Sequence, residues 1–209
     1  MESVITVIIE LKKDMKKLLS LISLILLCSP YSARADMAPE PDPFTDVSYD
    51  TVTAQIFNAV VYLKEEGIVN GYSDGTFRPN ELINRAEFSK IVSIATGSET
   101  DAGDGSGIFT DVNNSDWFNP YIQNLHSRGI ISGYADGSFK PAENINWAEA
   151  AKIVVKAHDL SVEESTDKEW YEPYTQVLEE LGIKPDSVAS PDQLLTRGEM
   201  AEIIGHKYP

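Results

Sequence analysis

Two arginines stand at positions suited to binding an anion. Arg85 and Arg197 directly follow Asn84 and Thr196, which are residues of the kind that caps the N-terminus of a helix. A guanidinium at the first helical position lies beside backbone N–H groups and the positive end of the helix dipole. Side-chain and backbone donors can therefore converge on one carboxylate, phosphate or pyruvyl group. We take the two arginines and the adjacent Asn84 and Thr196 as candidate ligand-binding residues. The corresponding position between these two arginines is Trp147, which carries no charge.

Both residue types also have a purely structural interpretation. Arg85 would then pair with a surface acid, a contact that contributes little stability. If Arg85 binds an anion instead, Arg85→Ala should weaken binding and leave the melting temperature nearly unchanged, with a smaller effect for Arg197→Ala. Trp147 is either a platform on which a sugar stacks or a partly buried structural residue, and we favour the second.

Two tight turns of nearly the same sequence accompany these helix starts. Residues 71–79 read GYSDGTFRP and residues 133–141 read GYADGSFKP. Asp followed by Gly is typical of a turn, because Gly adopts positive φ without strain and Asp hydrogen-bonds to nearby backbone. We expect the turns to wall a groove; the alternative is that they only shape the loop. The candidate groove residues in them are Gly71, Tyr72, Asp74, Gly133, Tyr134 and Asp136.

The turns belong to a longer internal repeat. Residues 67–97 and 129–159 align without a gap at an offset of 62, with 17 identities in 31 positions. The sequence Phe-Thr-Asp-Val at 44–47 returns at 109–112, which extends the repeat toward the N-terminus. A third, weaker copy starts near Trp170 and lacks the Gly-Tyr turn. This duplication predicts three copies of one supersecondary unit that share a core.

Each copy has the pattern of helix, tight loop, helix. In the first helix of the first copy Ile56, Ala59, Val60 and Leu63 recur at helical spacing, and Gly67 follows as a helix stop. The second helix of each copy begins with a capping box, in which a side-chain oxygen and a carboxylate satisfy the first N–H groups reciprocally. The pairs are Asn84 with Glu87, Asn146 with Glu149, and Thr196 with Glu199.

The chain is strongly acidic and, with 209 residues of which 42% are hydrophobic, it can bury a core. Its 17 Lys+Arg and 33 Asp+Glu give a net charge of −16, which disfavours binding to nucleic acid and to anionic membranes. Any anionic partner must therefore be held by a local site. The histidines His126, His158 and His206 lack metal-ligand spacing, and we identify no catalytic motif, metal site or cofactor site.

The first 35 residues have the features of a secretory signal peptide. Four lysines precede the largely apolar run 18–27, which is too short to span a bilayer, and the Ala-Arg-Ala sequence at 33–35 suits cleavage. Met15 is an alternative start. Cys28 is the only cysteine, so we expect no disulfide in the mature chain. Lipidation of Cys28 is the alternative, although Leu27 stands where such a signal needs a small residue.

Together these motifs resemble the S-layer homology (SLH) domain family, which commonly occurs as three tandem copies. The likeness rests on FTDV, on W-F/Y-x-P-Y, on G-I-I/V-x-G-Y-x-D-G-T/S-F-R/K-P and on I-N-R-A-E, and it covers residues 44–208. The resemblance implies an all-helical module that attaches proteins non-covalently to the bacterial envelope. It also implies that an anionic, often pyruvylated, cell-wall polysaccharide or peptidoglycan-linked polymer binds in grooves between copies, near Arg85 and Arg197.

We therefore predict an all-α fold of three helix–loop–helix repeats, packed in a pseudo-threefold arrangement after a signal peptide. The predicted function is non-catalytic attachment of a secreted protein at the bacterial cell wall or surface, with no membrane span. The alternatives are a surface-layer adaptor that contacts a protein in trans and a small secreted glycan hydrolase. The predicted segments are signal peptide 1–35, Pro-rich acidic lead-in 36–43, first repeat 44–97, linker 98–108, second repeat 109–160, linker 161–168 and degenerate third repeat 169–208.

Overall fold

The computed structural model describes residues 42–97, 107–163 and 167–206. The predicted signal peptide and Cys28 lie outside the described residues, as do most of the lead-in and parts of both linkers. Within the described part of the chain, no helix is both long enough and apolar enough to cross a membrane.

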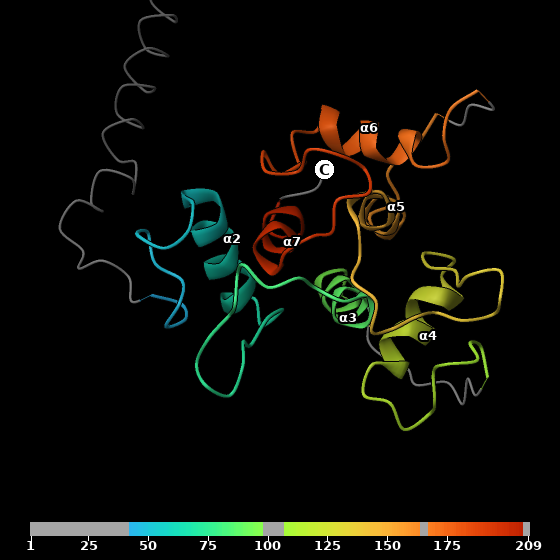
Figure 1. Cartoon of the computed structure of the whole chain (residues 1–209), viewed down its shortest axis with the longest axis horizontal. Coiled ribbons are helices and arrows are strands. Elements are labelled where there is room, and N and C mark those ends of the chain that lie inside the picture. Colours follow the sequence, from blue (N-terminus) through green and yellow to red (C-terminus); the bar gives the residue numbers. More distant parts are fainter. Residues whose placement is uncertain (1–41, 98–106, 164–166, 207–209) are drawn as a thin grey trace, which may run out of the picture. The chain divides into compact units, whose positions relative to one another are not determined.

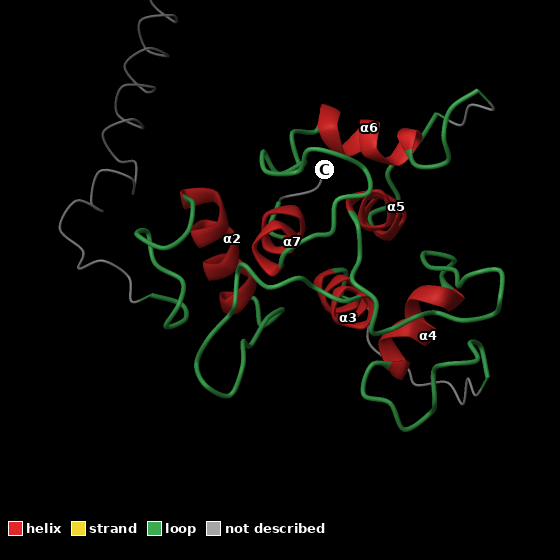
Figure 2. Cartoon of the chain, in the orientation of Figure 1, coloured by secondary structure: helices red, strands yellow, loops and turns green. Residues whose placement is uncertain are grey.

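Six α-helices form the regular structure of the described residues, which contain isolated β-bridges but no strand. This confirms the all-α prediction, and Figure 2 shows the helices joined by loops. Helices α2, α4 and α6 are the first helices of the three repeats, and α3, α5 and α7 are the second helices. Their bounds are α2 Ala54–Glu65, α3 Arg85–Ala95, α4 Asn119–Ser127, α5 Trp147–Ala157, α6 Glu172–Glu180 and α7 Arg197–Ile204.

The second helices begin at the three predicted capping boxes. In α3 the Asn84 side chain accepts a hydrogen bond from the Glu87 N–H at 2.9 Å, and the Glu87 carboxylate accepts one from the Asn84 N–H at 3.5 Å. The same reciprocal pair starts α5 at Asn146 and α7 at Thr196. Each pair satisfies N–H groups that a helix start otherwise leaves without partners, so the first turn is fixed locally.

The first helices end in the same way in all three repeats. Gly67, Gly129 and Gly182 follow α2, α4 and α6 with φ of 69°, 70° and 70°. Glycine adopts this left-handed conformation without the steric cost that a side chain brings. The chain therefore leaves each first helix in the same direction and enters the loop that precedes the second helix.

Each first helix packs against the second helix of a different repeat. Helix α4 of the second repeat packs on α3 of the first, α6 of the third on α5 of the second, and α2 of the first on α7 of the third. Figure 1 shows α3, α5 and α7 inside and the three first helices around them. Helix α3 also contacts α5 and α7. The repeats therefore share their apolar faces instead of burying them individually.

A ring of three backbone hydrogen bonds joins the repeats just before their second helices. The Ile83 N–H donates to the Leu195 carbonyl at 3.0 Å, Leu195 to Ile145 at 2.9 Å, and Ile145 to Ile83 at 3.1 Å. All three side chains are fully buried. The pseudo-threefold symmetry of the whole assembly stays a prediction, which this closed ring of bonds supports.

The apolar stripe predicted for α2 differs by one residue from the observed one. Phe57 is buried beside Ala59, Val60 and Leu63, whereas Ile56 is only partly buried. Ile56 instead lines a cavity between α2 and α7. The periodicity indicated a helical face correctly, but the packing partner decides which edge of that face is covered.

Residues 44–97 on their own should be largely unfolded. In that fragment α2 lacks α7 and α3 lacks α4, and helices this short are marginal in water without tertiary packing. Circular dichroism of the fragment should show little helicity, whereas residues 36–209 should melt in one cooperative transition. A fragment with native-like helicity and a cooperative melt would contradict the shared packing.

The Phe-Thr-Asp-Val segment holds the turn of its own repeat in place. The Asp46 carboxylate accepts hydrogen bonds from the N–H groups of Phe77 at 2.8 Å and Arg78 at 2.7 Å. Asp111 makes the equivalent pair of bonds in the second repeat. At Gly71, which has a φ of 67°, an added Cβ would lie 2.3 Å from the Phe44 ring. The turn therefore packs so closely that only glycine fits there.

Gly71→Ala should lower the free energy of unfolding more than Gly67→Ala does. Both residues have positive φ, which costs about 1 kcal/mol for alanine. A Cβ at Gly67 would meet no atom within 4 Å, whereas at Gly71 it would also collide with the Thr76 carbonyl at 2.7 Å. We expect Gly71→Ala to lose about 1 to 3 kcal/mol more than Gly67→Ala in urea unfolding. Equal losses would contradict the close packing of this turn.

Candidate binding grooves

Two grooves lie at equivalent places between repeats. The Arg197 groove has a volume of about 250 Å³ and the Arg85 groove about 200 Å³. Each combines an Arg from one repeat, the loop and second helix of another, and a Trp from the remaining one. The Arg197 groove is lined by residues 68–72, Glu87, Lys90, Ile91, Trp117 and Arg197, and the Arg85 groove by residues 130–134, Glu149, Lys152, Ile153, Trp170 and Arg85.

Arg85 is only 5% exposed, and several contacts hold its guanidinium. Its Nε donates to the Phe139 carbonyl at 3.0 Å, and one terminal nitrogen lies 3.0 Å from Oε1 of Glu149. The guanidinium carbon lies 5.0 Å from the ring centroid of Tyr134 and 4.8 Å from that of Phe139. The arginine of the first repeat is thereby fixed to the turn of the second.

Arg197 makes the same contacts with the first repeat. It is 6% exposed, and its Nε donates to the Phe77 carbonyl at 2.7 Å. Its guanidinium carbon lies 4.8 Å from the ring centroids of both Tyr72 and Phe77. The ion pair with Glu87 is looser than its counterpart, at 4.0 Å. The Arg197 charge is therefore less engaged by protein carboxylate than the Arg85 charge.

The tyrosines of the turns act as neutral hydrogen-bond donors at neutral pH. The Tyr134 hydroxyl donates to Oε1 of Glu149 at 2.9 Å. Burial raises the pKa of Tyr134 to about 12, and the Glu149 carboxylate beside it adds to the rise. Burial also raises the pKa of Tyr72. Both phenols consequently keep their protons. The Tyr134 proton is engaged by Glu149, so its hydroxyl oxygen can accept from a ligand, whereas the Tyr72 hydroxyl can donate to an oxygen-rich ligand.

A lysine stacked on a tryptophan forms one wall of each groove. The Lys90 Nζ lies 5.5 Å from the ring centroid of Trp117 and 5.8 Å from that of Tyr121. Lys152 lies at 5.3 Å from Trp170 in the equivalent arrangement. The two indoles are about half exposed, at 53% and 52%. Each groove therefore offers an ammonium group beside an accessible aromatic face.

The grooves are positive on a chain whose net charge is −16. Each is lined by an Arg and a Lys but by one carboxylate, Glu87 or Glu149. Burial lowers the pKa of Lys152, and the nearby Lys156 lowers it further. An anion in the groove would relieve both effects, because it favours the charged ammonium. In the described ranges, no group of three or more His, Cys, Asp or Glu residues is placed to hold a metal ion.

Comparison with known proteins agrees with this repeated geometry. Residues 43–89 and 108–151 match the S-layer homology domain family. These two segments are S-layer homology domains. The two matched segments are the repeats whose turns line the Arg197 and Arg85 grooves.

Similar segments occur in larger proteins. The chain is 30% identical over 172 residues to the middle cell wall protein of Brevibacillus brevis and 33% over 135 residues to a surface layer protein of Brevibacillus choshinensis. It is 29% identical over 196 residues to an uncharacterized cell wall amidase of Bacillus anthracis. These alignments cover 81%, 61% and 88% of this chain, but 16%, 12% and 34% of the relatives. The chain therefore spans a minor part of the length of each.

The structure brings some of the predicted site residues of the S-layer homology domains together and leaves others elsewhere. The residues that line the grooves are Gly71, Tyr72 and Arg197 in one, and Gly133, Tyr134 and Arg85 in the other. Trp147 lines neither groove and is 1% exposed, so it belongs to the core. Its indole has no free face for a sugar, and its burial is more complete than the partial burial expected.

The remaining predicted residues have structural contacts. Asn84 and Thr196 cap α3 and α7 and do not line the grooves. Asp74 accepts hydrogen bonds from the Thr76 N–H at 3.0 Å and hydroxyl at 2.6 Å, which lower the pKa of Asp74 to about 2. Asp136 closes the turn of the second repeat in the same way. Both aspartates shape the loop that carries the groove residues.

Sequence reasoning missed the lysines and the exposed tryptophans. Lys90 and Lys152 are among the identities between the first two repeats, and Trp117 and Trp170 occupy matching positions before the first helices of the second and third. The signal was present, because a Lys or Trp that recurs in two diverged copies outside the apolar stripe of a helix is not required by packing. What the sequence does not reveal is that these residues meet across repeats.

The burial of Arg85 changes the expected effect of removing it. Arg85→Ala leaves the Phe139 carbonyl and the Glu149 carboxylate without their cation, so we expect a loss of about 1 to 3 kcal/mol of unfolding free energy. This differs from the nearly unchanged melting temperature expected from the sequence. Lys152→Ala, from a partly exposed residue, should lose less than about 1 kcal/mol. Thermal unfolding measures both, and an unchanged melting temperature for Arg85→Ala would contradict its structural contacts.

Proposed function

We propose that the chain is a non-catalytic module that attaches to the bacterial cell envelope by binding an acidic wall polymer in its two grooves. The observation that carries this proposal is the recurrence of one set of side chains: an Arg, a Lys stacked on a Trp, and a Tyr. The set occurs twice on an otherwise acidic chain, and packing does not require its tryptophans, which are about half exposed, or its partly exposed lysines.

The groove chemistry suits a sugar with an acidic substituent. The ammonium of Lys90 or Lys152 can pair with a carboxylate, phosphate or pyruvyl group, since charge-assisted hydrogen bonds are the stronger kind. The exposed indole of Trp117 or Trp170 can pack on the apolar face of a sugar ring. The ligand class we favour is therefore an acidic wall polymer, either a pyruvylated polysaccharide or a peptidoglycan-linked polymer.

Two equivalent grooves also favour a polymeric ligand over a single sugar. A chain with repeated acidic units can occupy both grooves, and the second contact then forms at a high effective concentration. Such binding is retained at a surface even when each contact alone is weak. We infer from this that the protein is secreted and acts at the cell wall or cell surface.

The names of the relatives support attachment at the wall more than catalysis. Two of them are called a middle cell wall protein and a surface layer protein, and the cell wall amidase extends well beyond the matched segment. Glycoside hydrolysis usually needs a pair of carboxylates, whereas each groove is lined by one, which is engaged by an arginine. The adaptor alternative, in which a surface-layer protein is bound in trans, requires a further surface beyond these grooves.

Removing both groove lysines should weaken binding to the wall without unfolding the protein. We expect Lys90→Ala with Lys152→Ala to lose about 1.5 to 3 kcal/mol of binding free energy per groove, the range for hydrogen bonds to charged groups. The measurement is sedimentation of the protein with native and depyruvylated wall sacculi, beside a thermal melt.

The matched control is Lys168→Ala with Lys184→Ala, which removes the same charge outside the grooves. This control should bind native sacculi as the unmodified protein does, because local contacts and not net charge are proposed to hold the polymer. Undiminished binding of the groove variant would contradict the proposal, as would equal binding of the unmodified protein to both kinds of sacculi.

A further inference from the structure

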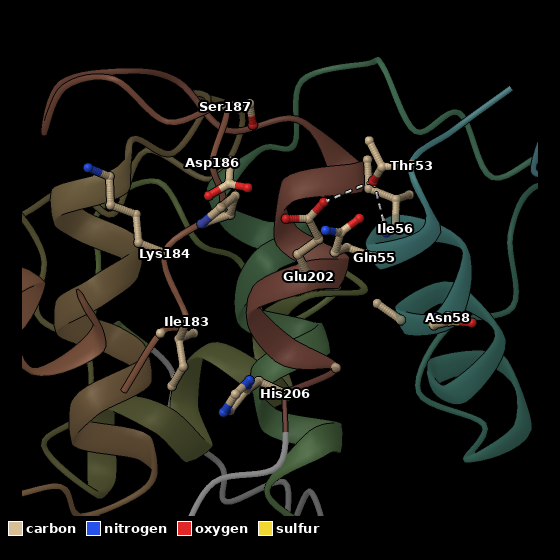
Figure 3. A pocket seen from close by; sticks show the side chains of 14 residues that line it. Thr53, Gln55, Ile56, Asn58, Ile183, Lys184, Asp186, Ser187, Glu202 and His206 are labelled. Atoms are coloured by element: carbon tan, nitrogen blue, oxygen red, sulfur yellow. Dashed lines mark hydrogen bonds between the residues drawn. The ribbon is translucent and has the colours of Figure 1, made fainter. Parts of the chain in front are cut away.

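A third cavity lies between the third and first repeats, where α2 packs against α7. We call it the Glu202 cavity; its volume is about 510 Å³, larger than either groove. Figure 3 shows its lining, with Glu202 of α7 facing the start of α2. The residues that matter for its chemistry are Thr53, Gln55, Ile56, Asn58, Asp186 and Glu202.

The Glu202 cavity carries the opposite charge at the position that holds lysine in the two grooves. Glu202 follows its capping residue Thr196 by six positions, as Lys90 follows Asn84 and Lys152 follows Asn146. The three residues therefore occupy the same place on α7, α3 and α5. The Glu202 cavity also lacks the arginine that lines each groove. The second repeat has Trp147 at the position equivalent to Arg85 and Arg197, and Trp147 is buried.

The carboxylate of Glu202 is partly buried and receives little compensation from the protein. It accepts a long hydrogen bond from the Thr53 hydroxyl, at 3.4 Å. Burial raises the pKa of Glu202 most, and the carboxylates of Glu199 and Asp186 raise it further. Lys184 also lines the cavity, but it pairs with Glu179 at 3.4 Å and extends away from Glu202 in Figure 3.

The rest of the lining resembles a sugar site in having an apolar floor and a polar rim. Ile56, Ala59 and Ile183 supply apolar surface. The exposed amide of Gln55 can donate to and accept from hydroxyl groups, and the Asn58 amide, whose oxygen accepts from the Tyr49 hydroxyl at 3.3 Å, can donate. A pyranose ring presents both kinds of surface. An acidic sugar in this cavity would be repelled by the negative charges of Glu202 and Asp186.

We propose that the Glu202 cavity binds a sugar that carries a protonated amine, with Glu202 as the partner of the ammonium group. The proposal goes beyond the function assigned to the two grooves, because it adds a site for a ligand of opposite charge. An ammonium beside Glu202 replaces the solvation that burial removes, and the rim amides orient the ring. One chain then contacts acidic units through two grooves and an amino sugar through the third position.

The test compares D-glucosamine with N-acetyl-D-glucosamine, which has the same ring but no charge. The two sugars are titrated at neutral pH into the whole protein while backbone amide NMR shifts are followed. We expect glucosamine to shift the signals of Thr53, Gln55 and Ile56, and to bind roughly tenfold more tightly than the acetylated sugar, as one charge-assisted contact provides. Equal affinity for the two sugars would overturn the proposal, as would shifts that avoid these residues.

Glu202→Gln removes the charge and keeps the shape. Because burial disfavours the ionised carboxylate, the amide should not lower the melting temperature, so lost binding would not reflect unfolding. We expect Glu202→Gln to bind glucosamine roughly tenfold more weakly. Glu65→Gln, from an exposed position on α2, removes the same charge and should leave binding unchanged. Equal weakening in both variants would show a general charge effect and overturn the proposal.

This outcome is distinguishable from failure of the wall-binding function. The variant with Lys90→Ala and Lys152→Ala should bind glucosamine as the unmodified protein does, because neither lysine lines the Glu202 cavity. Loss of glucosamine binding in that variant would place the amine in the grooves and overturn the proposal. Loss of binding to sacculi alone would bear on the grooves and leave the amine site standing.

Discussion

The structure depends on one constraint: a repeat buries its first helix mainly against another repeat. Helices α2, α4 and α6 each find their apolar partner on a second helix from a different copy. The backbone bonds among Ile83, Ile145 and Leu195 hold those second helices at fixed spacing. Because the apolar area is shared, the free energy of folding belongs to the set of three repeats and not to any one of them.

The grooves are a product of the same constraint, since each is completed by side chains from all three repeats. Arg85 and Arg197 hold the neighbouring turn through its backbone carbonyl, and the same contacts place their charge at the groove. Folding and recognition are therefore coupled at the arginines. Folding and recognition are separable at Lys90 and Lys152. These lysines stack on exposed indoles and can be substituted without disrupting the core.

Local signals in the sequence predicted the local parts of this structure. The capping box joins Asn84 to Glu87, three positions later, and the positive φ of Gly67 is a property of that one residue. Both features can therefore be recognised in the sequence before the fold is known. The burial of Arg85 and Arg197 could not be recognised, because the carbonyls that they contact lie 54 and 120 residues away. Lys90 and Trp117 belong to different repeats, so their contact could not be recognised from the sequence either. Helical periodicity alone left Trp147 open to two interpretations.

The contact between α2 and α7 joins the first described helix of the chain to the last. A pulling force between the first and third repeats would consequently act on this interface, together with the α3–α7 contact and the backbone bond from Ile83 to Leu195. The geometry of these contacts then sets the force at which the first and third repeats separate. Because α2 and α7 pack side by side, shear would have to break many side-chain contacts between them at the same time. The interface should therefore resist shear better than a contact made by a single loop.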